Sequence, residues 1–211
     1  MPDQISTIGR REGLLLLAVG AIALVLSGIA PFDRTTWWLE IFPILLVVPL
    51  LLVTASRFPL TPLLYRLILI HALILIVGGH WSYARVPVGF WVQELLGWQR
   101  NPYDRLGHLA QGFIPAMAAR EIFRRRIPLP AGRWLAFLVV ATCLALSACY
   151  ELVEWWAALA LGQGADEFLG TQGDPWDTQW DMFLALVGAI LAQLTLSRLH
   201  ERQLRGVATH G

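Results

Sequence analysis

The stretch NPYDRLGH, residues 101–108, decides the fold, because it places an aspartate, an arginine and a histidine at the start of a long apolar segment. That segment runs over residues 103–123 and is long enough for a helix to cross a bilayer. Asp104 and His108 are four residues apart, so they share one face of that helix. Ionisable groups are costly inside a membrane, and their presence there indicates a functional site.

Two later stretches place acidic groups at the ends of apolar segments in the same way. YELVEWW carries Glu151 and Glu154, three residues apart, and GTQGDPWDTQWD carries Asp177 and Asp181, four residues apart. Each pair lies on one face of its helix. We therefore expect three helices to present their polar pairs to a common site.

The composition is that of an integral membrane protein. Of the 211 residues, 56% are hydrophobic and only 15% are charged, and the mean hydropathy is +0.57. A soluble domain carries about 25% charged residues. The net charge of +1 gives no electrostatic case for nucleic acid as a partner. No polar linker interrupts the apolar segments, so residues 1–211 are predicted to form a single integral membrane domain.

The apolar segments predict an all-α, polytopic membrane helix bundle with six transmembrane helices. Their approximate ranges are 14–29, 37–55, 63–79, 103–123, 134–161 and 180–196. Residues 81–101 mix tryptophan, tyrosine and phenylalanine with charged side chains. That mixture suits a segment lying in the membrane interface.

The arginines predict the orientation. With six spans, twelve of the 16 arginines fall on the side that holds both termini. Positively charged loops favour the cytoplasm, so both termini are expected there. Glu151 lies about 26 Å along its helix from Trp134, at 1.5 Å per residue, near the outer end. The acidic and histidine side chains therefore gather near the periplasmic face. Glu121 lies near the opposite end, and we expect it to form a surface or interface ion pair with Arg120 and Arg124.

Such a set of side chains suits a divalent metal ion such as Zn²⁺, Mn²⁺ or Fe²⁺, bound between facing helices. The candidate metal ligands are Asp104, His108 and Asp177. The candidate catalytic carboxylates are Glu151, Glu154 and Asp181; Asp181 can also serve as a ligand, with either glutamate as the general base. The candidate substrate-binding residues are Arg105, His80 and Trp155.

Two other functions remain open. Closely spaced carboxylates can relay protons, as in a small proton-coupled transporter. The nearly apolar stretch LAFLVVATCLALSA counts against a transport path through the inner half of its helix. Buried polar groups can also serve only as hydrogen bonds between helices, which would fit a non-catalytic membrane protein of an envelope complex. The sequence does not indicate an oligomeric state.

Three blocks of sequence resemble the YjdF-like inner-membrane proteins of bacteria. They are FPLTPLLYRLILIHALILIVGGHWSYARVPVGF, NPYDRLGHLAQGFIPAMAAREI and YELVEWWAALALGQGADEFLGTQGDPWDTQWDMF. The resemblance covers most of the chain and implies a multi-pass protein of the bacterial inner membrane. It brings no established activity with it.

The order DRLGH, E-x-x-E and D-x-x-x-D, followed by Gly188, is also similar to the VanZ-like family. Arg105 stands where that family often has lysine, and Glu154 stands where it often has glutamine. One VanZ-like member is associated with glycopeptide-antibiotic resistance at the cell envelope. The positions that match are Asp104, His108, Glu151, Glu154, Asp177 and Asp181.

The leading hypothesis is a metal-dependent hydrolase or transferase in the inner membrane. Its substrate would be a lipid-linked or phosphate-containing envelope molecule, and membrane lipids would be its other partners. In that mechanism the metal ion polarises an ester or phosphoryl oxygen, or activates water.

Overall fold

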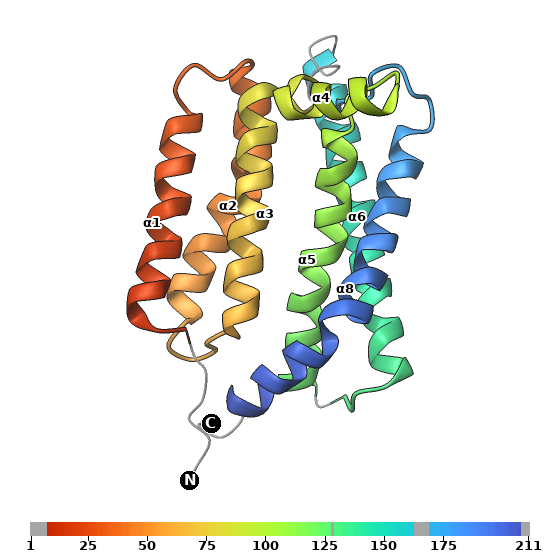
Figure 1. Cartoon of the computed structure of the whole chain (residues 1–211). Helices are drawn as coiled ribbons and strands as arrows, with labels where there is room; N and C mark the ends of the chain where they lie inside the picture. Colours follow the sequence, from red (N-terminus) through yellow and green to blue (C-terminus); the bar gives the residue numbers. More distant parts are fainter. Residues whose placement is uncertain (1–7, 128, 163–168, 208–211) are drawn as a thin grey trace.

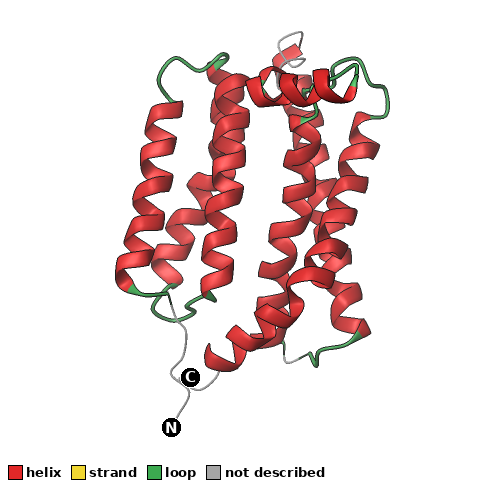
Figure 2. Ribbon diagram, in the orientation of Figure 1, coloured by secondary structure: helices red, strands yellow, loops and turns green. Residues whose placement is uncertain are grey.

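The computed structural model describes residues 8–127, 129–162 and 169–207, and within these ranges the chain forms helices and loops with no strand (Figure 2). The prediction of an all-α protein is confirmed. The long helices are α1 (Arg10–Ser27), α2 (Arg34–Thr54), α3 (Pro62–Trp81), α5 (Tyr103–Arg125), α6 (Arg133–Leu161) and α8 (Asp177–Val207). Two shorter helices, η1 (Tyr83–Arg85) and α4 (Pro87–Leu96), connect α3 to α5.

The long helices form two groups of three that lie side by side (Figure 1). In one group α3 packs against both α1 and α2, and in the other α5, α6 and α8 all pack against one another. Contacts between α3 and α5 join the groups. Helix α4 lies crosswise over one end of the bundle, in the segment predicted to lie in the interface, and exposes Phe90, Trp91 and Leu95.

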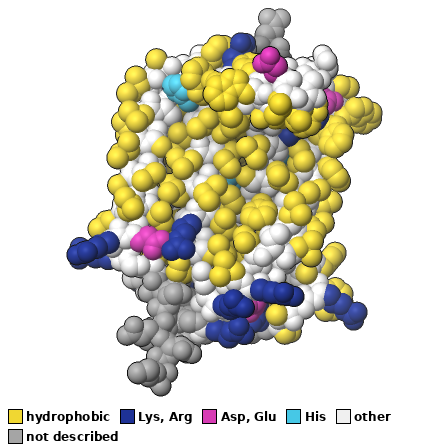
Figure 3. Space-filling view, viewed as in Figure 1, with side chains coloured by type: hydrophobic (Ala, Val, Ile, Leu, Met, Phe, Trp, Pro, Cys, Tyr) yellow, Lys and Arg dark blue, Asp and Glu magenta, His cyan; other side chains and the backbone are white. Residues whose placement is uncertain are grey.

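Four of the described helices, α2, α3, α6 and α8, are long and apolar enough to cross a membrane. Helix α1 begins with three charged residues and α5 carries charged residues at both ends, which places these two outside that set. A broad band of hydrophobic side chains covers the visible face, and the charged side chains gather toward its two ends (Figure 3). Exposed leucines, isoleucines and valines in such a band suit a lipid environment.

Glycines bring α5 and α8 into the most extensive contact of the bundle. A Cβ atom added at Gly112 would overlap the backbone of Ala185. One added at Gly188 would overlap the backbone of Leu109. Small residues allow membrane helices to approach this closely, because no larger side chain separates the backbones.

The prediction that Glu121 forms a surface or interface ion pair with Arg120 and Arg124 is wrong. Glu121 is fully buried. Its carboxylate accepts hydrogen bonds from the backbone N–H and hydroxyl of Thr61 and from Arg125, at 2.8–3.1 Å. Nε2 of His200 lies 3.0 Å from Glu121 Oε2. Four polar partners from three segments make burial of this charge possible, as a buried carboxylate requires.

The partners predicted for Glu121 bind Glu201 instead. Arg120 and Arg124 both donate to its carboxylate, at 2.7 and 3.0 Å. Gln203 also accepts a hydrogen bond from the backbone N–H of Leu63. These contacts explain why α8 continues to Val207, past the predicted end at residue 196: its polar last turns bind α5 and the start of α3.

We predict that Gly112→Val destabilises the protein by about 1–3 kcal/mol, because the added methyl groups would force α5 away from α8. Unfolding in detergent measures the change. Gly13→Val is the matched control, because a Cβ at Gly13 in α1 would meet only the side chain of Ile8, at 3.9 Å. Equal losses in the two variants would show that the α5–α8 contact has no special role.

Candidate functional site

Asn101, which is fully buried, fixes the start of α5. Its Oδ1 accepts a hydrogen bond from the backbone N–H of Tyr103, and its Nδ2 donates to the carbonyl of Val86, both at 3.0 Å. The lack of a side chain at Gly89 leaves room for the Asn101 amide. Because α5 begins at Tyr103, Asp104 lies in its first turn.

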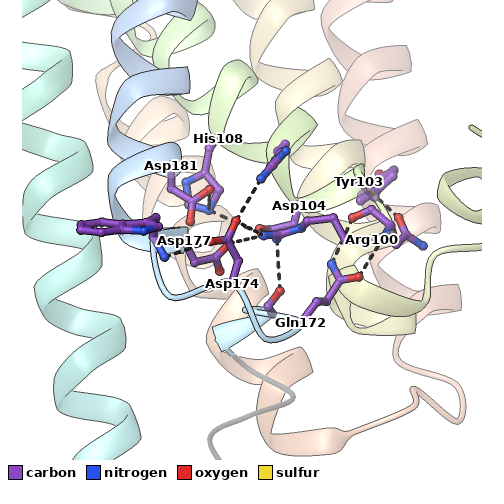
Figure 4. Close-up of polar contacts among 12 residues, drawn as sticks. Arg100, Tyr103, Asp104, His108, Gln172, Asp174, Asp177 and Asp181 are labelled. Carbon is purple, nitrogen blue, oxygen red and sulfur yellow. Dashed lines mark hydrogen bonds and ion pairs between the residues drawn. The ribbon is translucent and has the colours of Figure 1, made fainter. Parts of the chain in front are cut away.

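Asp104, His108 and Asp181 form a compact group, which we call the carboxylate–histidine centre. One ligand atom from each residue lies within 4.8 Å of the other two. His108 Nε2 is 3.5 Å from Asp104 Oδ1 and 3.7 Å from Asp181 Oδ1. All three side chains are buried, and they lie together at the ends of α5 and α8 (Figure 4).

Helix α6 adds two buried glutamates to this end of the bundle. Glu151 Oε1 lies 3.9 Å from His108 Nδ1, which is too long for a hydrogen bond. Glu154 is also buried, on the same face of α6. Three of the buried atoms without a hydrogen-bond partner in the described structure lie together here: His108 Nδ1, Glu151 Oε1 and Asp181 Oδ1. Unpaired buried charges are costly, so the arrangement suits a bound cation or bound protons.

Arg100 holds two of the aspartates. It donates to Asp104 Oδ2 at 3.1 Å and makes a close ion pair with Asp177. Burial lowers the pKa of Arg100, but the hydrogen bond to Asp177 and the nearby charges of Asp177, Asp104 and Asp181 outweigh it and raise the pKa overall. Arg100 is therefore a permanent positive charge, and Asp177 is its partner.

A further acid reaches the same end from the other group of helices. Glu40 of α2 is buried, and the side chains of Tyr83 and Tyr150 lie near its carboxylate. Gly79 makes room for it, because a Cβ there would lie 2.9 Å from Glu40 Cβ. Both groups of helices thus contribute carboxylates to one end of the bundle.

The structure brings most of the predicted site residues together. The group within 4.8 Å contains Asp181, the alternative ligand, in place of Asp177. Among the candidate substrate-binding residues, Arg105 Nη2 lies 3.1 Å from the carboxylate of Asp174. His80 Nδ1 lies 2.8 Å from the carbonyl oxygen of Ser27 at the end of α1, and Trp155 is 55% exposed on α6. The chemical roles assigned to all these residues stay predictions.

Sequence reasoning missed Gln172 and Asp174. The Gln172 amide pairs with both backbone groups of Asn101, accepting from its N–H at 2.9 Å and donating to its carbonyl at 3.0 Å. Gln172 and Gly173 have positive φ angles of 48° and 83°. Gln172 lies between Gly170 and Gly173, and Asp174 directly follows Gly173. Closely spaced glycines indicate a tight turn with positive φ angles, and the polar side chains of such a turn are the signal that could have identified both residues.

Comparison with known proteins identifies the family. Residues 13–202 match the model of the family described as predicted membrane protein (DUF2238). This chain belongs to that family. It is 58% identical, over 195 residues, to the inner membrane protein YjdF of Escherichia coli (strain K12). The match covers 90% of this chain and 93% of the relative. No solved structure matches.

The predicted resemblance to YjdF-like proteins is thus confirmed, and the chain is a membrane protein related to an inner-membrane protein. The more distant resemblance to the VanZ-like family stays a prediction.

Proposed function

We propose that the carboxylate–histidine centre binds a divalent metal ion and supports hydrolysis or transfer on a lipid-linked, phosphate-containing envelope substrate. The observation that carries this proposal is the compact group of Asp104, His108 and Asp181, whose ligand atoms lie within 4.8 Å of one another in a buried setting. Carboxylate oxygens combined with one imidazole suit Mn²⁺, Fe²⁺ or Zn²⁺.

The charge balance supports a bound cation. Six buried carboxylates lie at this end of the bundle: Glu40, Asp104, Glu151, Glu154, Asp177 and Asp181. Arg100 supplies one permanent positive charge to them. A divalent ion would offset two further negative charges, and the unpartnered oxygen of Asp181 could coordinate it.

In the proposed reaction the residues divide into two roles. Asp104, His108 and Asp181 would hold the ion, which when bound would supply a Lewis acid that polarises a phosphoryl oxygen and lowers the pKa of water. Glu151 or Glu154 takes the proton as a water oxygen or acceptor hydroxyl attacks phosphorus. The bond from phosphorus to the lipid oxygen breaks, and the protonated glutamate gives its proton to that leaving oxygen. Glu151 is well placed for this, because its Oε1 lies 3.9 Å from a ligand side chain without being bonded to it.

We also propose that the protein is one membrane domain with six spans, cytoplasmic termini and a periplasmic centre. Helices α1 and α5 run alongside the four apolar helices, which supports their crossing the same membrane (Figure 1). Helix α1 begins and α8 ends at the same end of the bundle, where arginines gather on the visible face (Figure 3). Arginine-rich ends favour the cytoplasm.

The metal content of purified protein tests the centre. We expect about one tightly bound divalent ion per chain, measured by elemental analysis, because three ligands are prearranged. His108→Ala and Asp181→Asn should lose it. Glu12→Gln, which removes an exposed carboxylate from the start of α1 at the opposite end of the bundle, should retain it. A metal-free wild-type protein, or unchanged metal in both ligand variants, would rule out this centre.

Activity assays separate the two roles. With the metal retained, Glu151→Gln or Glu154→Gln should slow phosphate release from a lipid phosphate by about 10²–10⁴-fold, the usual contribution of a general base. Full activity in both glutamine variants would exclude base catalysis by this pair.

Labelling of single cysteines tests the orientation. In a protein whose Cys143 and Cys149 are replaced by serine, Arg34→Cys should react with a membrane-impermeant maleimide in intact spheroplasts. Arg57→Cys and Arg126→Cys should react only after the membrane is opened. The reverse pattern would place the centre on the cytoplasmic side.

A further inference from the structure

A pocket of about 380 Å³ opens next to the carboxylate–histidine centre. Arg105 of α5 and Arg100, which lies just before α5, line one side of the pocket. The loop before α8 lines the other side. The lining residues are Trp98, Gln99, Arg100, Arg105, Gln172, Gly173 and Asp174. We call it the arginine pocket.

One carboxylate oxygen lies between the two arginines of this pocket. Asp174 Oδ2 is 3.1 Å from Arg105 Nη2. It is also 3.5 Å from Nη1 of Arg100, whose side chain lies beside Asp174 in Figure 4. Paired guanidinium groups bind phosphate oxygens through the same charge-assisted hydrogen bonds. The Asp174 carboxylate therefore occupies the position that a phosphate group would take.

The two arginines keep unused hydrogen-bonding capacity. The Nε atoms of Arg100 and Arg105 are buried without a hydrogen-bond partner in the described structure. A guanidinium carries five N–H donors, and a phosphate offers more acceptor oxygens than one carboxylate. Arg105 also lies over the ring of Trp180, 5.1 Å from its centroid, which restricts its orientation.

The pocket adjoins the centre through Arg100. The same guanidinium that contacts Asp174 donates to Asp104 Oδ2 at 3.1 Å. A phosphate group held by Arg100 would therefore lie beside a proposed metal ligand.

The turn that carries Asp174 is held in place by contacts that do not involve the two arginine contacts of Asp174. Its Oδ1 accepts a hydrogen bond from the backbone N–H of Trp176 at 2.9 Å, within the turn. Gln172 ties the turn to Asn101 on one side, and Asp177 ties it to Arg100 on the other. The side chain of Asp174 is 22% exposed, so it can exchange its arginine contacts for water without the turn leaving its place.

We propose that Arg100 and Arg105 bind the phosphate group of the substrate, and that the Asp174 carboxylate occupies this position until phosphate displaces it. The inference rests on the proposed function, because it names the substrate group recognised at that site. A lipid headgroup and free inorganic phosphate share this chemistry, and the experiment separates them.

Binding of two probes by the full-length protein tests the proposal. Binding of inorganic phosphate is measured by calorimetry on protein in detergent. Binding to nanodiscs that contain phosphatidic acid is compared with binding to nanodiscs of phosphatidylcholine alone. Asp174→Asn keeps an oxygen for the Trp176 N–H but loses the competing charge, so it should bind phosphate about tenfold more tightly. Arg105→Gln should bind it about tenfold more weakly or worse. Glu94→Gln is the matched control, because it removes one exposed negative charge from α4 outside the pocket, and it should leave binding unchanged.

Binding of phosphatidic acid alone identifies a lipid headgroup as the source, and binding of inorganic phosphate alone identifies free phosphate. Failure of both probes to bind wild type and Asp174→Asn would overturn the inference. It would also be overturned if Asp174→Asn bound no more tightly than Glu94→Gln. Tighter binding by Asp174→Asn in a protein that holds no metal would support the arginine pocket while the proposed metal chemistry failed. If the protein binds metal but Asp174→Asn does not change phosphate binding, the proposed metal site stands and the arginine pocket is overturned.

Discussion

The backbones of α5 and α8 touch at Gly112 and Gly188, and the geometry of the rest of the site follows from that contact. Between helices in a membrane, packing of small residues and polar contacts replace the hydrophobic effect as the main attraction. Asp104, His108 and Gly112 follow one another at intervals of four residues along one face of α5. Asp181 and Ala185 continue in the same way along α8. The faces that carry the acids therefore also carry the residues that allow close approach.

Polar contacts hold this helix pair at both ends. At one end, His108 lies between Asp104 and Asp181. At the other, Glu121 contacts His200 across the same two helices. Removing one partner of a buried ion pair is strongly destabilising, although the intact pair adds little stability. Such contacts fix the register of the two helices, and a fixed register is what a metal site needs from its scaffold.

Much of the fold follows from local sequence features. Apolar length located the long helices, and intervals of three or four residues identified which acids share a face. The environment of Glu121 could not be predicted this way. Its partners Thr61 and His200 are 60 and 79 residues away along the chain, and only the packing of three helices brings them together. Its sequence neighbours Arg120 and Arg124 suggested a simpler pairing that the structure does not adopt.

At the site, too, some features follow from local sequence and others depend on packing. The sequence placed Asp177 and Asp181 on one helical face, but Arg100 decides which of them remains for the centre, by binding Asp177. Gln172 and Asp174 act from a loop, where no periodic pattern marks a side chain as directed inward. Within the site, residues on regular helices were therefore placed correctly, whereas residues whose position depends on a turn were not predicted.

We propose that α5 and α8 together present one histidine and two aspartates to a single metal ion. Pulsed electron paramagnetic resonance on protein loaded with Mn²⁺ tests it most directly, because nitrogen bound to the ion couples to the manganese spins. We predict nitrogen coupling in the wild-type protein that disappears in His108→Ala. Absence of nitrogen coupling in the wild type, or coupling that persists in His108→Ala, would contradict the claim.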